Sequence, residues 1–264
     1  MRKTFLYRAK IGKQTEKTAH HWLDICREVY NSALRQRIIR YRESQESISA
    51  YTQAKQLPSI KKDFPEVKTV NSQTLQDVLE RLDKGYKAFF RRVKKSEKPG
   101  FPRFKNSQSY NSFTLKQSGY IIDGRYLHVK NVGRFKLFLS RPVEGDIKTI
   151  TIRRMPTGKW FVAFSCDNVP VQILPQASEK VGIDVGIKHF LVDDKGGSVE
   201  NPKYFRRAEK LLRRRQRSLC RRKKGSNRRD KTKILVAKTH EKIYNQRKDF
   251  LHKVANQYIA RFQT

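Results

Sequence analysis

Acidic residues are scarce in this chain. Its 264 residues include 24 Asp and Glu against 60 Lys and Arg, which gives a formal net charge of +36. Self-repulsion on this scale disfavours a compact chain unless a polyanion neutralises it. Nucleic acid is the natural partner, because each neutralised phosphate releases condensed counterions. A basic protein that binds a membrane surface is the alternative interpretation.

Long apolar runs and paired cysteines are also missing. We find no apolar run of about 18 residues that could span a bilayer, and no signal-peptide core after Met1. Cys26, Cys166 and Cys220 lie far apart without a CxxC pair, which argues against a zinc site or a disulfide framework. The sequence therefore predicts a cytoplasmic, nucleoid-associated protein with no membrane partner.

The first hundred residues have mostly helical spacing. Residues 3–10 can form a short strand, and apolar residues three and four apart predict helices over 15–43 and 72–93. Ser72 is the predicted N-cap of the second helix. The polar stretch between the helices contains Pro58 and Pro65, which we interpret as helix breakers.

The next segment has the pattern of an antiparallel sheet. Apolar alternation between turn residues predicts strands over 112–117, 120–129, 134–139, 147–154 and 159–166. Short strands with regular turns favour a small antiparallel β-barrel. If the N-terminal strand joins this barrel, the two helices form an insertion in it. The fold class is therefore α+β.

The remaining residues combine a β-hairpin with basic helices. A linker with Pro170 and Pro175 leads to predicted strands over 179–185 and 188–193, and helical spacing runs from 203 to 261 with a break near Gly225. Residues 203–248 hold twenty Lys and Arg but three acids. A solvated charged face is one interpretation, and contact with a nucleic-acid backbone is the other. The candidate phosphate contacts are Arg206, Arg207, Arg213, Arg214, Arg217, Arg221, Arg222, Lys223, Lys224, Arg228 and Arg229.

One carboxylate, Asp184, lies within the apolar run from Val181 to Val192. This run predicts a buried strand, where a charge costs several kcal/mol unless something pairs with it. Asp184 could bond to turn amides near Gly186. Alternatively, it could be the first metal ligand of an RNase H-like nuclease that uses two divalent cations. The nearby Asp193-Asp194-Lys-Gly-Gly197 segment favours a hairpin turn over a cation-binding loop.

Several segments, taken in order along the chain, resemble the TnpB family of transposon-encoded OrfB proteins, which is related to type V CRISPR effectors. The matching segments are Glu28 to Asn31, Tyr86 to Arg92, Lys98 to Phe104, Gly182 to Lys188, Glu200 to Lys203, Ser218 to Gly225, His240 to Ile243 and Asn245 to Lys253.

This resemblance implies RNA-guided cleavage of DNA. The implied partners are a guide RNA from the transposon end and double-stranded target DNA, and the implied cofactor is Mg²⁺. Residues 1–12 and 105–174 would form a wedge-type barrel, 13–104 a helical recognition insert, and 175–264 an incomplete RuvC nuclease domain with long basic helices. Asp184 would be the first catalytic and metal-binding carboxylate. Tyr51, Gln76 and Thr114 would contact the target-adjacent motif of the DNA.

The chain departs from the family pattern at its end. In the family, the strand bearing the second acid begins near Thr264, and a Cys-rich zinc element and a third acid follow. We therefore expect residues 1–264 alone to bind nucleic acid without cutting it, since one carboxylate of three cannot assemble a two-metal site. A missing C-terminal part on another chain could complete the site. The alternative is a non-catalytic, basic DNA- or RNA-binding regulatory remnant of a transposase-associated gene.

Overall fold

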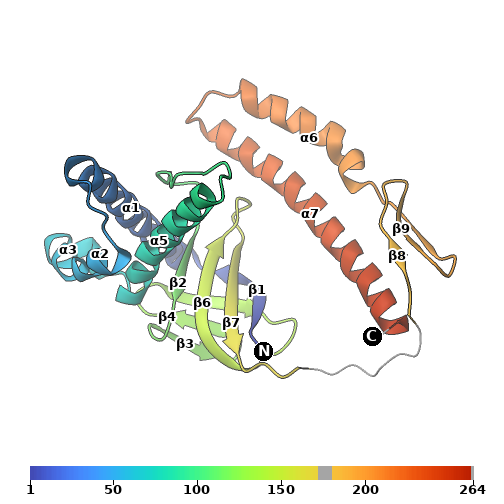
Figure 1. Cartoon of the computed structure of the whole chain (residues 1–264), viewed down its shortest axis with the longest axis horizontal. Helices are drawn as coiled ribbons and strands as arrows, with labels where there is room; N and C mark the ends of the chain where they lie inside the picture. Colours follow the sequence, from blue (N-terminus) through green and yellow to red (C-terminus); the bar gives the residue numbers. More distant parts are fainter. Residues whose placement is uncertain (172–179, 263–264) are drawn as a thin grey trace. The chain divides into compact units, whose positions relative to one another are not determined.

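The computed structural model describes residues 1–171 and 180–262, and the chain divides into two compact units, Met1–Pro170 and Val171–Thr264 (Figure 1). The predicted domain boundary between residues 174 and 175, with the linker residue Pro175, lies outside the described residues.

The first unit is built on a seven-stranded antiparallel sheet of order β2-β6-β7-β1-β5-β4-β3. β1 (Lys3–Ile11) lies in the middle, between β7 (Trp160–Asp167) and β5 (Gly133–Phe138). The expectation that the N-terminal strand joins the sheet is therefore confirmed, and the helices between β1 and β2 are an insertion. The other strands are β2 (Ser112–Leu115), β3 (Tyr120–Asp123), β4 (Tyr126–Val129) and β6 (Asp146–Arg154).

The sheet is curled into a half-barrel (Figure 1). Along β7, successive residues alternate between buried and partly exposed positions. In β1, likewise, Phe5, Tyr7 and Ala9 are buried while their neighbours are exposed. Within the described residues, the edge strands β2 and β3 do not pair with each other, so the predicted small barrel is a half-barrel with two open edges.

The predicted strand 120–129 is two strands. Asp123 pairs with Tyr126 across a tight turn in which Gly124 has φ +50°. This backbone conformation suits glycine, because a side chain there is strained. An Asp-Gly pair such as Asp123-Gly124 commonly marks a turn, and it divides the predicted segment into β3 and β4.

Two long helices, α1 (Lys13–Ser44) and α5 (Ser72–Lys94), pack on each other and on the sheet. Trp22 of α1 contacts Phe113 of β2, with ring centroids 5.5 Å apart. The N-cap of α5 is Asn71, whose side chain accepts a hydrogen bond from the Gln73 amide, rather than the predicted Ser72. The helices between them are α2 (Ala50–Lys55), α3 (Leu57–Asp63) and α4 (Pro65–Lys68).

The two prolines of this connection begin short helices instead of only breaking them. Pro58 lies in the first turn of α3, and Pro65 is the first residue of α4. A proline is tolerated there because the first amides of a helix have no intrahelical acceptor. The predicted breaks therefore lie where one short helix gives way to the next, between α2 and α3 and between α3 and α4.

Two arginines act as internal donors in this unit. Arg37 is buried; it donates to Gln53 at 2.9 Å and to Asp83 at 3.2 Å, and so joins α1 to α2 and α5. Arg81 of α5 pairs with Asp77 at 2.6 Å and donates to the Ser112 carbonyl at 3.0 Å, which ties α5 to β2. Basic residues therefore stabilise packing here as well as charging the surface.

The second unit joins a small sheet to a helical hairpin. Its strands β8 (Ile183–Asp184), β9 (His189–Asp193) and β10 (Ser198–Glu200) form a sheet of order β10-β9-β8. The long helices α6 (Tyr204–Arg221) and α7 (Asn227–Arg261) pack together, with the predicted break between them. The expectation of a buried strand at 181–192 is wrong, since β8 is exposed and Ile187 is 90% accessible.

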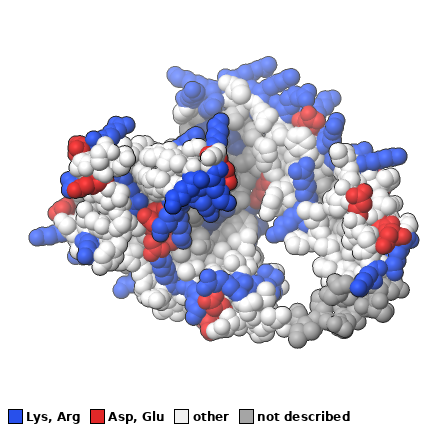
Figure 2. Space-filling model, viewed as in Figure 1, with Lys and Arg blue, Asp and Glu red and all other residues white. Residues whose placement is uncertain are grey.

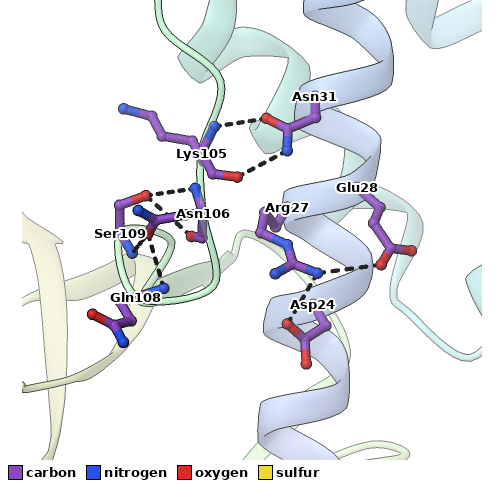
Figure 3. Close-up of polar contacts among 8 residues, drawn as sticks. All are labelled: Asp24, Arg27, Glu28, Asn31, Lys105, Asn106, Gln108 and Ser109. Atoms are coloured by element: carbon purple, nitrogen blue, oxygen red, sulfur yellow. Dashed lines mark hydrogen bonds and ion pairs between the residues drawn. The ribbon is translucent and has the colours of Figure 1, made fainter. Parts of the chain in front are cut away.

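A single asparagine secures the loop that leads from α5 back to the sheet (Figure 3). The Asn31 amide donates to the Lys105 carbonyl at 2.9 Å, and its oxygen accepts from the Lys105 amide at 2.8 Å. The next residue, Asn106, accepts from the amides of Gln108 and Ser109 and so closes a tight turn. Asn31 therefore supplies both partners for one backbone unit of a segment without regular structure.

Replacing Asn31 by alanine should lower the free energy of unfolding by about 1–3 kcal/mol, because two partly buried hydrogen bonds of about 0.5–1.5 kcal/mol each are lost. Urea unfolding followed by circular dichroism measures this change. Arg27→Ala on the same helix is the matched control. Its ion pairs with Asp24 and Glu28, at 3.4 and 3.3 Å, are on the surface and should contribute under about 1 kcal/mol. Equal losses in the two variants would contradict the role of Asn31.

Candidate nucleic-acid interface

Five cations form a continuous stripe on α6. Arg207, Lys210, Arg214, Arg217 and Arg221 are three and four residues apart, so their side chains share one side of the helix. All five are exposed, and they line one shallow groove. At a rise of about 1.5 Å per residue the stripe is about 21 Å long. We call these residues the cationic face of α6; Figure 2 shows Lys and Arg side chains gathered along this helix.

The opposite side of α6 packs on α7. Leu212 is buried there, and Arg215 donates from Nη1 to the Leu235 carbonyl at 3.0 Å and to the Thr239 hydroxyl at 2.5 Å. Arg215 therefore joins the two helices, although it differs from its neighbour Arg214 only by its position on the helix. Sequence reasoning did not assign this role.

The structure divides the predicted phosphate contacts into two groups. Arg229 donates to the carbonyls of Leu219 and Arg222 at 2.7 and 3.0 Å, which satisfies acceptors at the end of α6. Arg213 forms an ion pair with Glu209 at 3.0 Å. Within the described residues, the other predicted side chains have no hydrogen bond or ion pair to the protein: Arg206, Arg207, Arg214, Arg217, Arg221, Arg222, Lys223, Lys224 and Arg228.

Asp184 lies on β8, opposite Val192 of β9, and is exposed. The Gly186 amide donates to the Phe190 carbonyl at 3.4 Å, so the interpretation of Asp184 as a buried residue bonded to that turn is wrong. Within residues 1–171 and 180–262, no group of three or more His, Cys, Asp or Glu side chains could hold a metal ion. These residues alone do not fit a two-cation site, and Asp184 offers it one carboxylate.

Asp193 joins the small sheet to α7. It accepts hydrogen bonds from the amides of Lys195 and Gly197, which confirms the predicted hairpin turn. It also accepts one from the Tyr258 hydroxyl at 2.7 Å. The Tyr258 hydrogen bond, followed by that of the Gly197 amide, holds the pKa of Asp193 below its usual value. No signal in the sequence links Asp193 to a tyrosine 65 residues away.

The three predicted DNA-contacting residues differ in accessibility. Tyr51 on α2 is 71% exposed, and Gln76 on α5 is exposed as well. Thr114 on β2 is 6% exposed, and its hydroxyl accepts a hydrogen bond from Arg81 at 2.5 Å. Thr74 of α5 donates to the Thr114 carbonyl, so α5 and β2 lie together. All three DNA contacts remain predictions.

Two family models match the chain. One is an OrfB model of IS605 described as "Probable transposase", which matches residues 163–264. The other is an OrfB model of IS605 described as "Helix-turn-helix domain", which matches residues 1–46. Residues 1–46 fold as β1 and one long helix, α1, without a turn between two helices.

Curated relatives extend the match along the chain. A protein of Streptomyces pristinaespiralis named "Putative RNA-guided DNA endonuclease" is 29% identical over 90% of this chain, which covers 59% of that protein. "Putative RNA-guided DNA endonuclease InsQ" of Escherichia coli (strain K12) is 30% identical over 95% of this chain, which covers 61% of that protein. The chain therefore spans about three fifths of the length of these relatives.

Among solved structures, a Cas12f1–sgRNA–target DNA complex matches with a TM-score of 0.41 and 15% identity, over 98% of this chain and 70% of that one. The matched models describe OrfB proteins of IS605, and together with the relatives named RNA-guided DNA endonucleases they support a protein of the TnpB type. In the part of the chain that the structure describes, no helix is both long enough and apolar enough to cross a membrane.

The neighbours Arg214 and Arg215 should respond differently to alanine substitution. Arg215→Ala should destabilise the α6–α7 hairpin by about 1–3 kcal/mol, since two hydrogen bonds from a charged donor are lost. Arg214→Ala should change stability by less than about 0.5 kcal/mol, because it is a surface substitution without a partner. Thermal unfolding and hydrogen exchange of α6 measure both effects. Equal stability of the two variants would contradict the assignment of Arg215 to the helix interface.

Proposed function

We propose that this chain binds a guide RNA and double-stranded target DNA as the nucleic-acid-binding part of a TnpB-type RNA-guided endonuclease. The observation that carries the proposal is the cationic face of α6. Among the described residues its side chains have no hydrogen bond or ion pair to the protein, whereas their neighbours Arg215 and Arg229 do. Exposed guanidinium groups in a row suit phosphate oxygens, which they bind in bidentate geometry. The names of the two relatives support the same activity.

Within this proposal each part of the chain has a role. The sheet of residues 1–12 and 105–174 is the wedge-type support, residues 13–104 are the recognition insert, and residues 175–264 belong to an RNase H-like RuvC domain. Tyr51 and Gln76 would contact the target-adjacent motif from exposed positions on the insert. Thr114 would act through Arg81, to which its hydroxyl is bonded. The guide would come from the transposon end.

Asp184 would supply the first carboxylate of the nuclease site, whose family cofactor is Mg²⁺. Bound cations would activate water and stabilise the leaving oxygen of the phosphodiester. Because the described residues form no cluster of three or more potential metal ligands, we propose that residues 1–264 by themselves bind without cutting. The alternative, a regulatory remnant without guide dependence, differs in that no defined RNA would co-purify with it.

Binding should depend steeply on salt. Replacing Arg207, Arg214 and Arg217 by glutamine should reduce the slope of log K against log salt by about two to three, because each lost phosphate contact removes about 0.7–0.9. Fluorescence anisotropy with a labelled RNA measures the slope. A control variant replaces Arg213, Lys233 and Lys253, which are already paired with carboxylates, and changes the net charge equally. If the control lowers the slope as much, net charge rather than the cationic face governs binding.

Purified chain 1–264, loaded with its guide RNA, should leave target DNA intact in Mg²⁺. Adding the C-terminal part of a TnpB relative as a separate polypeptide should restore guided cleavage, and Asp184→Ala should then abolish it. Gel analysis of a labelled target measures both reactions. Guided cleavage by chain 1–264 alone that Asp184→Ala abolishes would contradict the proposal.

A further inference from the structure

A second cleft lies beside the cationic face, between the start of α6, the β8–β9 loop and α7. Its volume is about 940 Å³. Four aromatic rings line it, and Phe250 of α7 contacts two of them edge-on: Phe190 at 4.9 Å and Tyr204 at 6.2 Å between ring centroids. The fourth ring, Phe205, is exposed at the mouth of the cleft, with the Arg247 guanidinium 5.9 Å from its centroid.

The Asn201 side chain shapes this cleft. It donates to the Ile187 carbonyl at 3.2 Å, which holds the β8–β9 loop, and accepts from the Lys203 amide at 3.0 Å. Lys203 has φ +48°, a conformation that non-glycine residues adopt rarely, and it turns the chain directly into α6. The segment Glu200 to Lys203 thus acquires a structural role, because it sets Tyr204 and Phe205 at the cleft.

Among the described residues, the charged side chains that line the cleft are all cationic. They are Lys188, Lys203, Arg206 and Arg247. Arg206 also lines the groove of the cationic face, so the two surfaces are continuous through one side chain. An apolar floor with a cationic rim that leads into a row of arginines suits a ligand with a flat aromatic part and attached phosphates.

We propose that this cleft receives an unpaired nucleobase of a single-stranded nucleic acid whose flanking phosphates lie on Arg206 and the cationic face of α6. This inference rests on the proposed function, because the base in the cleft would belong to the strand whose phosphates α6 would hold. Bases stack on aromatic side chains irrespective of sequence, since every base has a flat π-face. A paired base is already stacked in its duplex, so the cleft selects unpaired nucleotides.

The test compares Phe205→Ala with Tyr244→Ala, a matched exposed aromatic residue on α7 outside the cleft. The probe is a single-stranded RNA of about twelve nucleotides, a length typical of single-strand binding sites, with the DNA of the same sequence as a second arm. Phe205→Ala should weaken binding by about 5- to 150-fold, as expected for the loss of one base-stacking contact, and Tyr244→Ala by less than about twofold. Weaker binding of either the RNA or the DNA supports the site. The strand type whose affinity falls more, RNA or DNA, is the one that supplies the base.

Two further measurements make the test specific. Phe205→Ala should not weaken binding to a blunt duplex, and Phe205→Trp should keep the affinity of the natural protein while its new indole fluorescence is quenched by the single strand. Circular dichroism establishes that the variants fold. Equal affinity of Phe205→Ala and the natural protein for single strands, an equal loss on the duplex, or an equal loss in Tyr244→Ala would overturn the inference.

Failure of this inference can be told apart from failure of the proposed function. If only the cleft proposal is wrong, the natural protein keeps its steep salt dependence and Phe205→Ala has no effect. If phosphate binding by α6 is wrong, replacing Arg207, Arg214 and Arg217 leaves the salt slope unchanged, whatever Phe205→Ala does.

Discussion

Electrostatic repulsion among 60 Lys and Arg, with only 24 acids to offset them, is the constraint on which the rest of this structure depends. The fold uses some of these cations as internal donors. Arg37 and Arg81 join the helices and sheet of the first unit, and Arg215 and Arg229 secure the α6–α7 hairpin of the second. Each of these arginines offers several donors in a fixed plane, which lets one side chain bond to two or more acceptors at once.

This internal use of arginine determines what remains for a ligand. Because Arg215 and Leu212 face α7, the residues on the opposite side of α6 must face solvent. The cationic face is therefore a consequence of how the hairpin packs, and the aromatic cleft at its start lies where Asn201 directs the chain into α6. Phosphate binding and base stacking are thus proposed for adjoining surfaces of one unit.

Local patterns in the sequence predicted most elements, while contacts between distant residues were not predictable. Residues 72–93 show helical spacing throughout, and α5 spans nearly the same range. The predicted strand 120–129 contains the turn pair Asp123-Gly124, and the structure divides it there into β3 and β4. The links from Asn31 to Lys105 and from Asp193 to Tyr258 join residues far apart, and the exposure of Ile187 depends on what packs nearby. For the same reason, Arg214 and Arg215 could not be separated by sequence alone.

Arginine footprinting with and without RNA tests the central claim most directly, namely that one face of α6 holds the nucleic-acid backbone. A dicarbonyl reagent that modifies accessible guanidinium groups, read out by mass spectrometry, reports each arginine separately. We predict that Arg207, Arg214, Arg217 and Arg221 react in the free protein and are protected by bound RNA, while Arg215 and Arg229 react slowly in both states. Unchanged reactivity of the four surface arginines when RNA is bound would contradict the account.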